Sequence, residues 1–164
     1  MLSTSEEEYR NLKVLKPAFG FAKMKLKKSN EIQEASHRFF IQRHLLERGW
    51  MTYTPAADHQ GVDWIAMHIP TNDVSSSAGK PYLVGAIKVQ QKGALTINKK
   101  YSGRDIWIAL RHGESVILVP HDFLLMTNEG RQAQTTNSWT ANGEYSWPSP
   151  SRSLLSAIKS YIIT

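Results

Sequence analysis

Two apolar stretches decide the fold of this chain: residues 61–69, with the sequence GVDWIAMHI, and residues 82–92, with the sequence YLVGAIKVQQK. Both are short, mostly apolar and rich in β-branched or aromatic side chains, which is typical of strands buried in a sheet. Residues 71–81 between them, TNDVSSSAGKP, favour a flexible hairpin connection over a linker between domains. The sequence therefore predicts two neighbouring strands joined by a long hairpin loop.

The segment before these strands has the period of an α-helix. Asn30 is its predicted N-cap, and Gly49 is predicted to end it. Residues 50–54 then predict a first short strand, which Pro55 stops. The helix and the three strands that follow it predict an α/β fold.

Residues 95–104 are ambiguous between a strand and a loop. The elements predicted after them are a strand at 105–111, a turn at 112–113, a strand at 115–120, a short helix from 122, a loop at 127–150 and a helix at 152–162. Trp139 and Trp147 lie in that predicted loop, where they pin it onto the domain or, alternatively, stack on nucleic-acid bases. Together these elements predict a mixed central sheet flanked by helices.

Length and charge set the class of protein. With 164 residues and 41% hydrophobic content, the chain is large enough for one domain with its own core, predicted at residues 30–164. Residues 1–29 are predicted to be a basic extension, because seven Lys and Arg residues occur between Arg10 and Lys28 without one acid. With a net charge of +6, a polyanion such as DNA is a sensible partner, although the extension could equally be a solvated arm.

Several classes of protein have no support. The chain has no cysteine, which excludes disulfides, zinc thiolates and a cysteine nucleophile. It lacks a His-x-x-x-His pair, a Gly-x-Ser-x-Gly elbow and a Gly-rich phosphate loop. No signal peptide and no run long enough to cross a bilayer is found, so we expect a cytoplasmic protein with no membrane partner.

Polar side chains in the predicted strands suggest a chemistry. Side chains on a strand alternate between faces, so Lys88, Gln90 and Lys92 are expected on one face and Gln91 on the other. Asp63 lies near the start of the preceding strand. Carboxylate and amide oxygens are ligands for hard cations such as Mg²⁺, and a nearby lysine can serve an attacking water or a developing phosphate charge.

The order of Glu34 on a helix, Asp63 on one strand and Gln90-x-Lys92 on the next resembles the core of the PD-(D/E)XK nuclease superfamily. The resemblance covers residues 30–125 and implies a restriction-endonuclease-like αβββαβ core. It also implies a metal-dependent endonuclease that hydrolyses DNA phosphodiester bonds.

The resemblance implies roles for four residues. Glu34, Asp63 and Gln90 would bind Mg²⁺ (Mn²⁺ is possible), and Lys92 would serve the attacking water. The family pattern has an acid where this chain has Gln90, which offers a neutral amide oxygen without charge. Glu31 competes with Glu34 as the helical acid, since residues three apart share a helix face.

Further basic residues are candidate DNA contacts: Lys88, Lys99, Lys100 and Arg104. An enzyme that cuts both strands would suit a homodimer. Two alternatives stay open on the same fold: a nucleic-acid-binding module with a decayed metal site, and a subunit whose basic extension binds an acidic protein.

Overall fold

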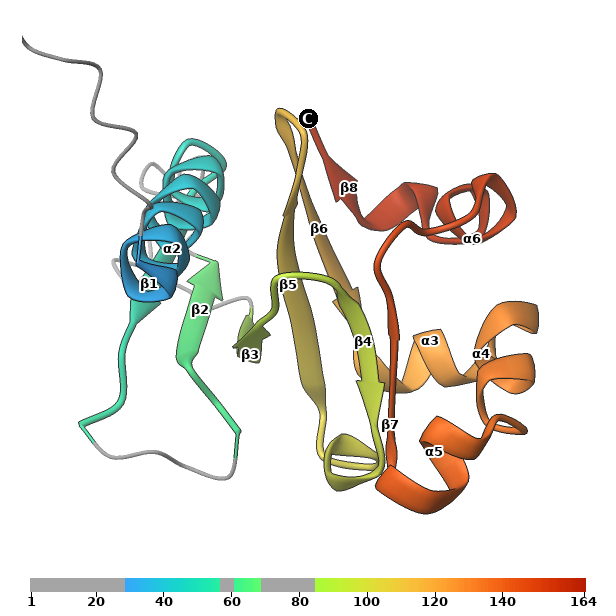
Figure 1. Ribbon diagram of the computed structural model, residues 1–164. Helices are drawn as coiled ribbons and strands as arrows, with labels where there is room; N and C mark the ends of the chain where they lie inside the picture. The colour runs from blue at the N-terminus through green and yellow to red at the C-terminus, as the bar shows by residue number, and fades with distance from the viewer. Residues whose placement is uncertain (1–28, 57–60, 69–84) are drawn as a thin grey trace, which may run out of the picture.

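A six-stranded mixed sheet organises the chain in the computed structural model, which describes residues 29–56, 61–68 and 85–164. The strands have the order β1-β2-β3-β5-β6-β8; β3 and β5 are parallel and every other pair is antiparallel. Their bounds are Trp50–Tyr53 (β1), Trp64–His68 (β2), Gly85–Gln91 (β3), Ile106–His112 (β5), Ser115–Pro120 (β6) and Ile162–Ile163 (β8). Helices lie on both sides of this sheet (Figure 1), so the predicted α/β class is confirmed.

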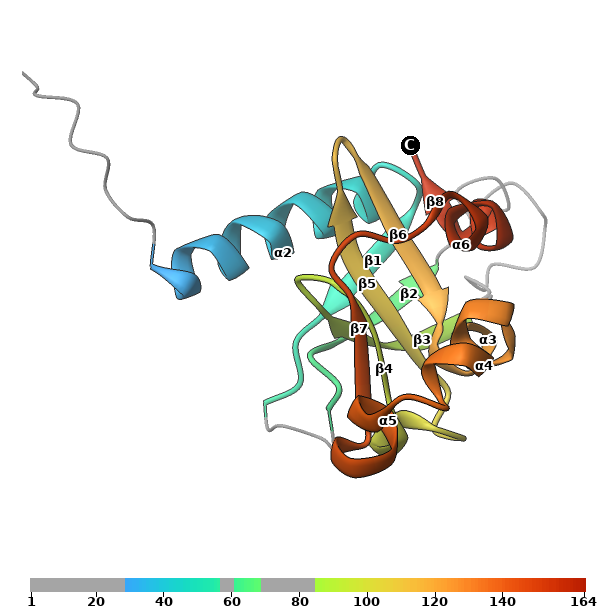
Figure 2. The same ribbon diagram turned by 45° about the vertical axis from the view of Figure 1, so that its right-hand side comes forward.

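Helix α2 (Asn30–Leu46) covers one face of the sheet with its C-terminal half only. Ile41 and Leu45 are fully buried there, against strand residues that include Trp64 and Val89. The N-terminal half extends past the sheet (Figure 2) and is mostly exposed. This half is therefore free to form the wall of a site at the strand ends.

The start of α2 differs from the prediction by one residue. Ser29, and not Asn30, is the N-cap, because the Ser29 hydroxyl accepts a hydrogen bond from the backbone N–H of Ile32 at 3.3 Å. At the other end Gly49 has φ of 79°, as expected for a glycine that closes the turn after a helix.

The opposite face is covered over β5 and β6 by four short helices and a two-stranded ribbon (Figure 1). The helices are α3 (His121–Met126), α4 (Asn128–Ala133), α5 (Asn137–Asn142) and α6 (Arg152–Ala157), and the ribbon pairs β4 (Leu95–Asn98) with β7 (Glu144–Trp147). Leu95, Ile97, Tyr101 and Leu154 are among the side chains buried in this second core.

The connection between the parallel strands β3 and β5 contains β4 and the 3₁₀ turn η3 (Lys99–Tyr101) where the αβββαβ order would have an α-helix. Leu95 and Ile97 alternate with more polar residues, which is the period of a strand, and β7 supplies the partner. The ambiguity of residues 95–104 is settled by this pairing, which comes from about 50 residues further along the chain.

The prediction of a loop at residues 127–150 was wrong, because this stretch contains α4, α5 and β7. Thr127 and Thr136 cap the two helices through their hydroxyls. Gly130 lies so close to α3 that a Cβ there would be 1.9 Å from the Leu124 carbonyl oxygen. Trp139 is 8% exposed, which confirms that it pins this region onto the core.

The C-terminal helix is shorter than predicted. Helix α6 ends at Ala157, the 3₁₀ turn η4 (Lys159–Tyr161) follows, and Ile162 pairs with Ile117 as β8. The spacing of apolar residues at 152–162 fits one continuous helix, but it also fits a short helix followed by an edge strand. The chain forms the short helix and the strand, because β6 has a free edge with which Ile162 can pair.

Residues 1–28 lie outside the described residues, so the basic extension and the boundary of the domain stay predictions. In the part of the chain that the structure describes, no helix has the length and apolar character to cross a membrane.

Candidate active site

A pocket of about 370 Å³ lies between the exposed half of α2 and the ends of the first strands. All four residues of the predicted tetrad line it: Glu34, Asp63, Gln90 and Lys92. The other described lining residues are Asn30, Gln33, His37, Gln91 and Gly93. Glu31 is not among them, so of the two helical acids it is Glu34 that faces the pocket.

Asp63 lies just before β2, in the short segment that joins Gly61 to the strand. Its backbone N–H donates to the carbonyl of Val89 at 2.9 Å, which holds the segment against β3. Its Oδ2 accepts two hydrogen bonds, from Gln90 Nε2 at 2.7 Å and from the backbone N–H of Gln91 at 2.8 Å. Within the described residues both bonds go to Oδ2, which leaves Oδ1 available to a ligand in the pocket.

Burial raises the pKa of Asp63, because desolvation disfavours its charged form. The negative charge of Glu34 raises this pKa further, whereas the N–H of Gln91 and the charges of Arg38 and Lys92 lower it. The carboxylate is thus partly desolvated beside a second acid. A cation in the pocket would relieve both costs.

Gly61 allows Asp63 to take this position. It has φ of 87°, in the left-handed region, and a Cβ there would be 2.5 Å from Cε1 of Tyr101. The ring of Tyr101, 1% exposed, therefore packs directly on the Gly61 backbone. Nothing in the sequence predicted this contact between Gly61 and the Tyr101 ring, 40 positions away.

Gly61→Ala is expected to lower the free energy of unfolding by about 2–4 kcal/mol, from left-handed strain plus the clash with Tyr101. Chemical denaturation measures this. Gly113→Ala is the matched control, since Gly113 also has positive φ (61°) but has open space around it, and it should cost about 1–2 kcal/mol. Equal losses in the two variants would show that the Tyr101 contact contributes nothing.

Lys92 follows the last residue of β3 and is anchored by its backbone N–H, which donates to the Ala109 carbonyl at 2.9 Å. Its Nζ lies 5.5 Å from the centroid of the Tyr101 ring, and the Nζ of Lys100 lies 4.9 Å from the same centroid. Both are cation–π distances. Tyr101 thus orients two ammonium groups next to the pocket.

Gln90 and Gln91 point in opposite directions, as the alternation predicts, and both contribute. Gln90 is half-buried and bonds Asp63, while Gln91 is 8% exposed and its Nε2 donates to the Glu34 carbonyl at 3.1 Å. Gln91 therefore joins β3 to α2 and sets the width of the pocket. No role of Gln91 was predicted from the sequence. The feature that could have indicated one is an amide side chain on the same strand face as the apolar residues Ile87 and Val89.

Arg38 is the other residue that sequence reasoning missed. Its Nη2 lies 3.4 Å from Oε1 of Glu34, one helical turn away, and its charge lowers the pKa of Asp63. The i,i+4 spacing from Glu34 could have revealed it. The positive charge of Arg38 therefore offsets part of the negative charge of the two carboxylates, Glu34 and Asp63.

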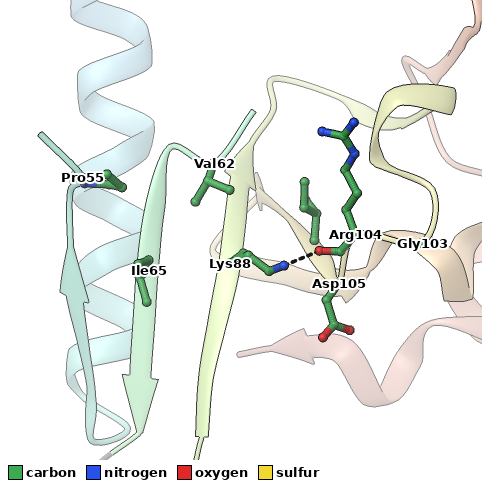
Figure 3. Close-up of a pocket in the computed structure, with 8 residues that line it drawn as sticks. Pro55, Val62, Ile65, Lys88, Gly103, Arg104 and Asp105 are labelled. Carbon is green, nitrogen blue, oxygen red and sulfur yellow. Dashed lines mark hydrogen bonds between the residues drawn. The ribbon is translucent and has the colours of Figure 1, made fainter. Parts of the chain in front are cut away.

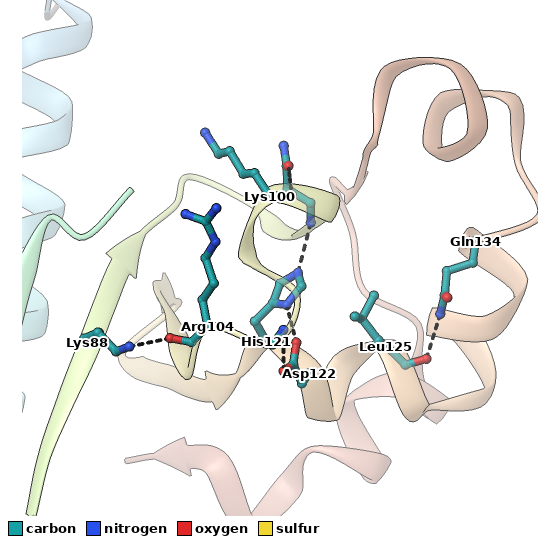
Figure 4. A network of polar contacts seen from close by, with 9 residues as sticks. Lys88, Lys100, Arg104, His121, Asp122, Leu125 and Gln134 are labelled. Atoms are coloured by element: carbon teal, nitrogen blue, oxygen red, sulfur yellow. Dashed lines mark hydrogen bonds and ion pairs between the residues drawn. The ribbon is translucent and has the colours of Figure 1, made fainter. Parts of the chain in front are cut away.

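The four predicted DNA contacts divide into two groups. Lys88 donates from Nζ to the backbone carbonyl of Arg104, and Figure 4 shows Lys100 and Arg104 extending toward one side of the η3 turn. Lys99 instead donates to the Thr140 carbonyl at 3.2 Å and lies 5.7 Å from the Trp139 ring centroid. Its side chain fastens η3 to α5, which explains its position without a ligand.

A buried histidine holds η3 in place. His121 is 0% exposed; its Nε2 accepts from the backbone N–H of Asn98 at 3.0 Å, and its Nδ1 lies 2.9 Å from Oδ1 of Asp122 (Figure 4). Since Nε2 accepts, the ring is neutral with its proton on Nδ1. Asp122 also accepts from the N–H of Gly103 at 2.9 Å, so the network spans both ends of the turn.

Acidification is expected to destabilise the protein through His121. Burial lowers the pKa of this histidine below its ordinary value of 6.5, although Asp122 opposes the shift. Between the two pKa values the unfolded chain binds a proton at His121 and the folded chain does not. The contribution of neutral His121 to the free energy of unfolding is therefore fully present above about pH 6.5 and is lost as the pH falls toward the lowered pKa. Thermal unfolding between pH 8 and 5 should show a steeper loss for the wild type than for His121→Gln. Parallel curves would contradict this role.

Comparisons with known proteins were made for the sequence and for the structure. No family model matches the chain, and no curated protein matches it. Among solved structures, the bacterial homing endonuclease I-Ssp6803I is similar with a TM-score of 0.40 and 15% sequence identity, over 82% of this chain and 86% of that one.

Proposed function

We propose that this protein is a divalent-metal-dependent nuclease that hydrolyses phosphodiester bonds of DNA. One observation carries the proposal: Glu34, Asp63, Gln90 and Lys92, which come from a helix and two strands, line a single pocket. A second acid, an amide and an anchored lysine thus surround one partly desolvated carboxylate, that of Asp63. These are the groups that metal-assisted phosphodiester hydrolysis requires.

The donor set fits a hard cation. Mg²⁺ prefers oxygen ligands and keeps several waters, so two carboxylates and one amide oxygen are enough. Asp63 and Glu34 both line the pocket, and the two hydrogen bonds that the Asp63 carboxylate accepts from Gln90 and Gln91 both go to Oδ2. Within the described residues no three His, Cys, Asp or Glu side chains gather for a metal ion, so beyond the two carboxylates a cation would rely on the Gln90 amide, directly or through water.

Gln90 must turn its amide to serve as a direct ligand. Its Nε2 donates to Oδ2 of Asp63 at 2.7 Å and to the Gln91 carbonyl at 3.2 Å. If Oε1 were to bind a cation, the amide would have to turn and give up both hydrogen bonds.

Each residue then has a role. When bound, Mg²⁺ would polarise the phosphoryl oxygen and lower the pKa of a coordinated water. Lys92 orients the attacking water or stabilises the charge that develops on the phosphate, and Tyr101 keeps its ammonium in place. Arg38 holds Glu34 within reach of the pocket. Lys88, Lys100 and Arg104 bind the DNA backbone beside the site.

A second candidate is a nucleic-acid-binding module without catalysis. The neutral amide of Gln90 favours it, because the described lining of the pocket then offers a cation only two carboxylates, those of Glu34 and Asp63. Such a module would bind DNA with strong salt dependence and without response to Mg²⁺. A homodimer suited to cutting both strands stays a prediction.

The test is cleavage of labelled duplex and branched DNA by purified protein in Mg²⁺, Mn²⁺ and EDTA. Glu34→Gln is expected to reduce cleavage by about 10–100-fold, through loss of one ligand charge. Glu47→Gln is the matched control: Glu47 also pairs with an arginine four residues away on α2, Arg43, but lies at the far end of the helix. DNA binding without cleavage in either metal would favour the second candidate, and equal activity of the two variants would exclude Glu34.

A further inference from the structure

A second pocket, of about 760 Å³, lies beside the candidate active site. Its floor is one cross-strand row of the sheet, in which Lys88 pairs with Ile65 on β2 and with Ile106 on β5. The other described lining residues are Pro55, Val62, Gly103, Arg104 and Asp105. Figure 3 shows Pro55 beyond β2, Ile65 on β2 and Lys88 on β3, with Arg104 and Asp105 across from them on the loop before β5.

The two pockets share a strand and a wall. Lys88 and Gln90 lie on the same face of β3, two residues or about 7 Å apart. Val62 lines the larger pocket and the next residue, Asp63, lines the smaller one. The two pockets are therefore close enough to hold neighbouring parts of one DNA strand.

The chemistry of the walls suits a nucleoside. Val62 and Ile65 offer apolar surface for the flat face of a base, and Lys88 and Arg104 add positive charge to the lining. Lys88 gives one of its three ammonium protons to the Arg104 carbonyl, so two remain for a phosphate. The Asp105 carboxylate adds an acceptor for a base N–H.

The loop that forms the far wall is held in a specific shape. Asp105 has φ of 60° and is the one non-glycine with positive φ among the described residues. The Gly103 N–H donates to Asp122, and the Arg104 carbonyl accepts from Lys88. In Figure 3 the side chains of Arg104 and Asp105 leave this loop in opposite directions, so its cation and its acid serve different parts of a ligand. Backbone strain of this kind is commonly retained at ligand sites.

We infer that this pocket receives a nucleoside of the DNA strand, next to the phosphate at the candidate active site. The inference rests on the proposed function, because it takes the position of that phosphate from it. The protein would then require an accessible, unstacked base next to the cut, which favours branched, mismatched or single-stranded DNA over an intact duplex.

The test uses a series of otherwise identical DNA substrates with one abasic site at each position around the cut. Wild-type protein should lose about tenfold in cleavage at one position only. Ile65→Phe, which fills the floor of the pocket, should cut intact DNA about tenfold more slowly than the wild type does. On the matching abasic substrate the variant and the wild type should cut at the same rate. Met51→Phe is the control, because Met51 lies on the same sheet face outside the pocket. Equal cleavage of all abasic substrates, or equal slowing of both substrates by Ile65→Phe, would overturn the inference.

A second measurement separates the pocket from catalysis. DNA with a photoreactive diazirine on one base is bound in EDTA and cross-linked, and the modified peptide is identified by mass spectrometry. Cross-links to residues 62–65 or 103–106 support the pocket even if no cleavage is ever seen. Cross-links confined to other segments overturn it even if the protein is an active nuclease.

Discussion

Asp63→Asn is expected to reduce DNA cleavage by about 10³-fold while leaving the protein at least as stable as the wild type at pH 7. Asparagine keeps an oxygen to accept the hydrogen bonds from Gln90 and Gln91, so the fold around the pocket persists. What disappears is the negative charge that binds the cation. Losing about 4 kcal/mol of transition-state stabilisation corresponds to the stated factor.

The stability half of this prediction follows from the raised pKa of Asp63. In the folded chain burial disfavours the ionised carboxylate, so above its folded-state pKa this charge costs stability. The cost shrinks as the pH falls through that pKa and vanishes below about pH 3.8, where folded and unfolded chains are both protonated. The neutral amide of the Asp63→Asn variant would carry no such cost at any pH.

Two measurements check this: single-turnover cleavage, and thermal unfolding at pH 7 and pH 3 with and without Mg²⁺. Mg²⁺ should raise the melting temperature of the wild type but not of the variant. A variant that cuts DNA at the wild-type rate would remove Asp63 from the site. A variant that loses activity together with several degrees of stability would show that Asp63 is a structural residue.

Gln90→Glu is expected to have opposite effects without and with metal. Without a cation, the new carboxylate would lie within hydrogen-bonding distance of Asp63 Oδ2, where Gln90 Nε2 is now 2.7 Å away. A favourable bond would become a like-charge contact in a desolvated pocket, which should cost about 1–3 kcal/mol. In Mg²⁺ the same substitution adds a ligand charge, so the cation should bind at least about tenfold more tightly.

Unfolding followed in EDTA and over a Mg²⁺ titration measures both effects. At about 2–4 °C per kcal/mol, the variant should melt several degrees below the wild type in EDTA and recover as Mg²⁺ saturates. Gln90→Ala distinguishes charge from simple loss of the hydrogen bond, since it should be destabilised without recovery. A Gln90→Glu protein that is indifferent to Mg²⁺ would show that the pocket holds no cation, and would favour the non-catalytic binding module.

The proposed site was largely predictable because its parts are local. A strand alternates its side chains, so Gln90 and Lys92 were expected to share a face at the end of the strand that the structure describes as β3. Asp63 was found for a similar reason, as a polar residue at the start of a buried strand. Glu34 needed the tertiary structure: its spacing on α2 could not exclude Glu31, and only the folded chain shows that Glu34 lines the pocket and Glu31 does not.

The supporting residues were less predictable, because their partners are distant in the chain. Tyr101 packs on Gly61, and Gln91 bonds the carbonyl of Glu34, across separations of 40 and 57 residues. Nothing in the sequence near Tyr101 indicates that its ring will orient Lys92. Similarly, Lys99 and Lys100 are adjacent and identical, yet one is fastened to α5 and the other lies over Tyr101.

Local patterns in the sequence were enough to specify the class of fold, the order of the first helix and strands, and the residue types that the pocket collects, because hydrophobic periodicity and strand alternation act over a few residues. Three outcomes needed the folded chain: residues 127–150 form helices and a strand, residues 162–163 leave the helix to join the sheet, and Lys88, Ile65 and Ile106 form one pocket floor. Those outcomes depend on which surfaces remain to be covered once the central strands have paired. A local sequence pattern contains no information about a partner strand about 50 residues away, such as β7 for β4.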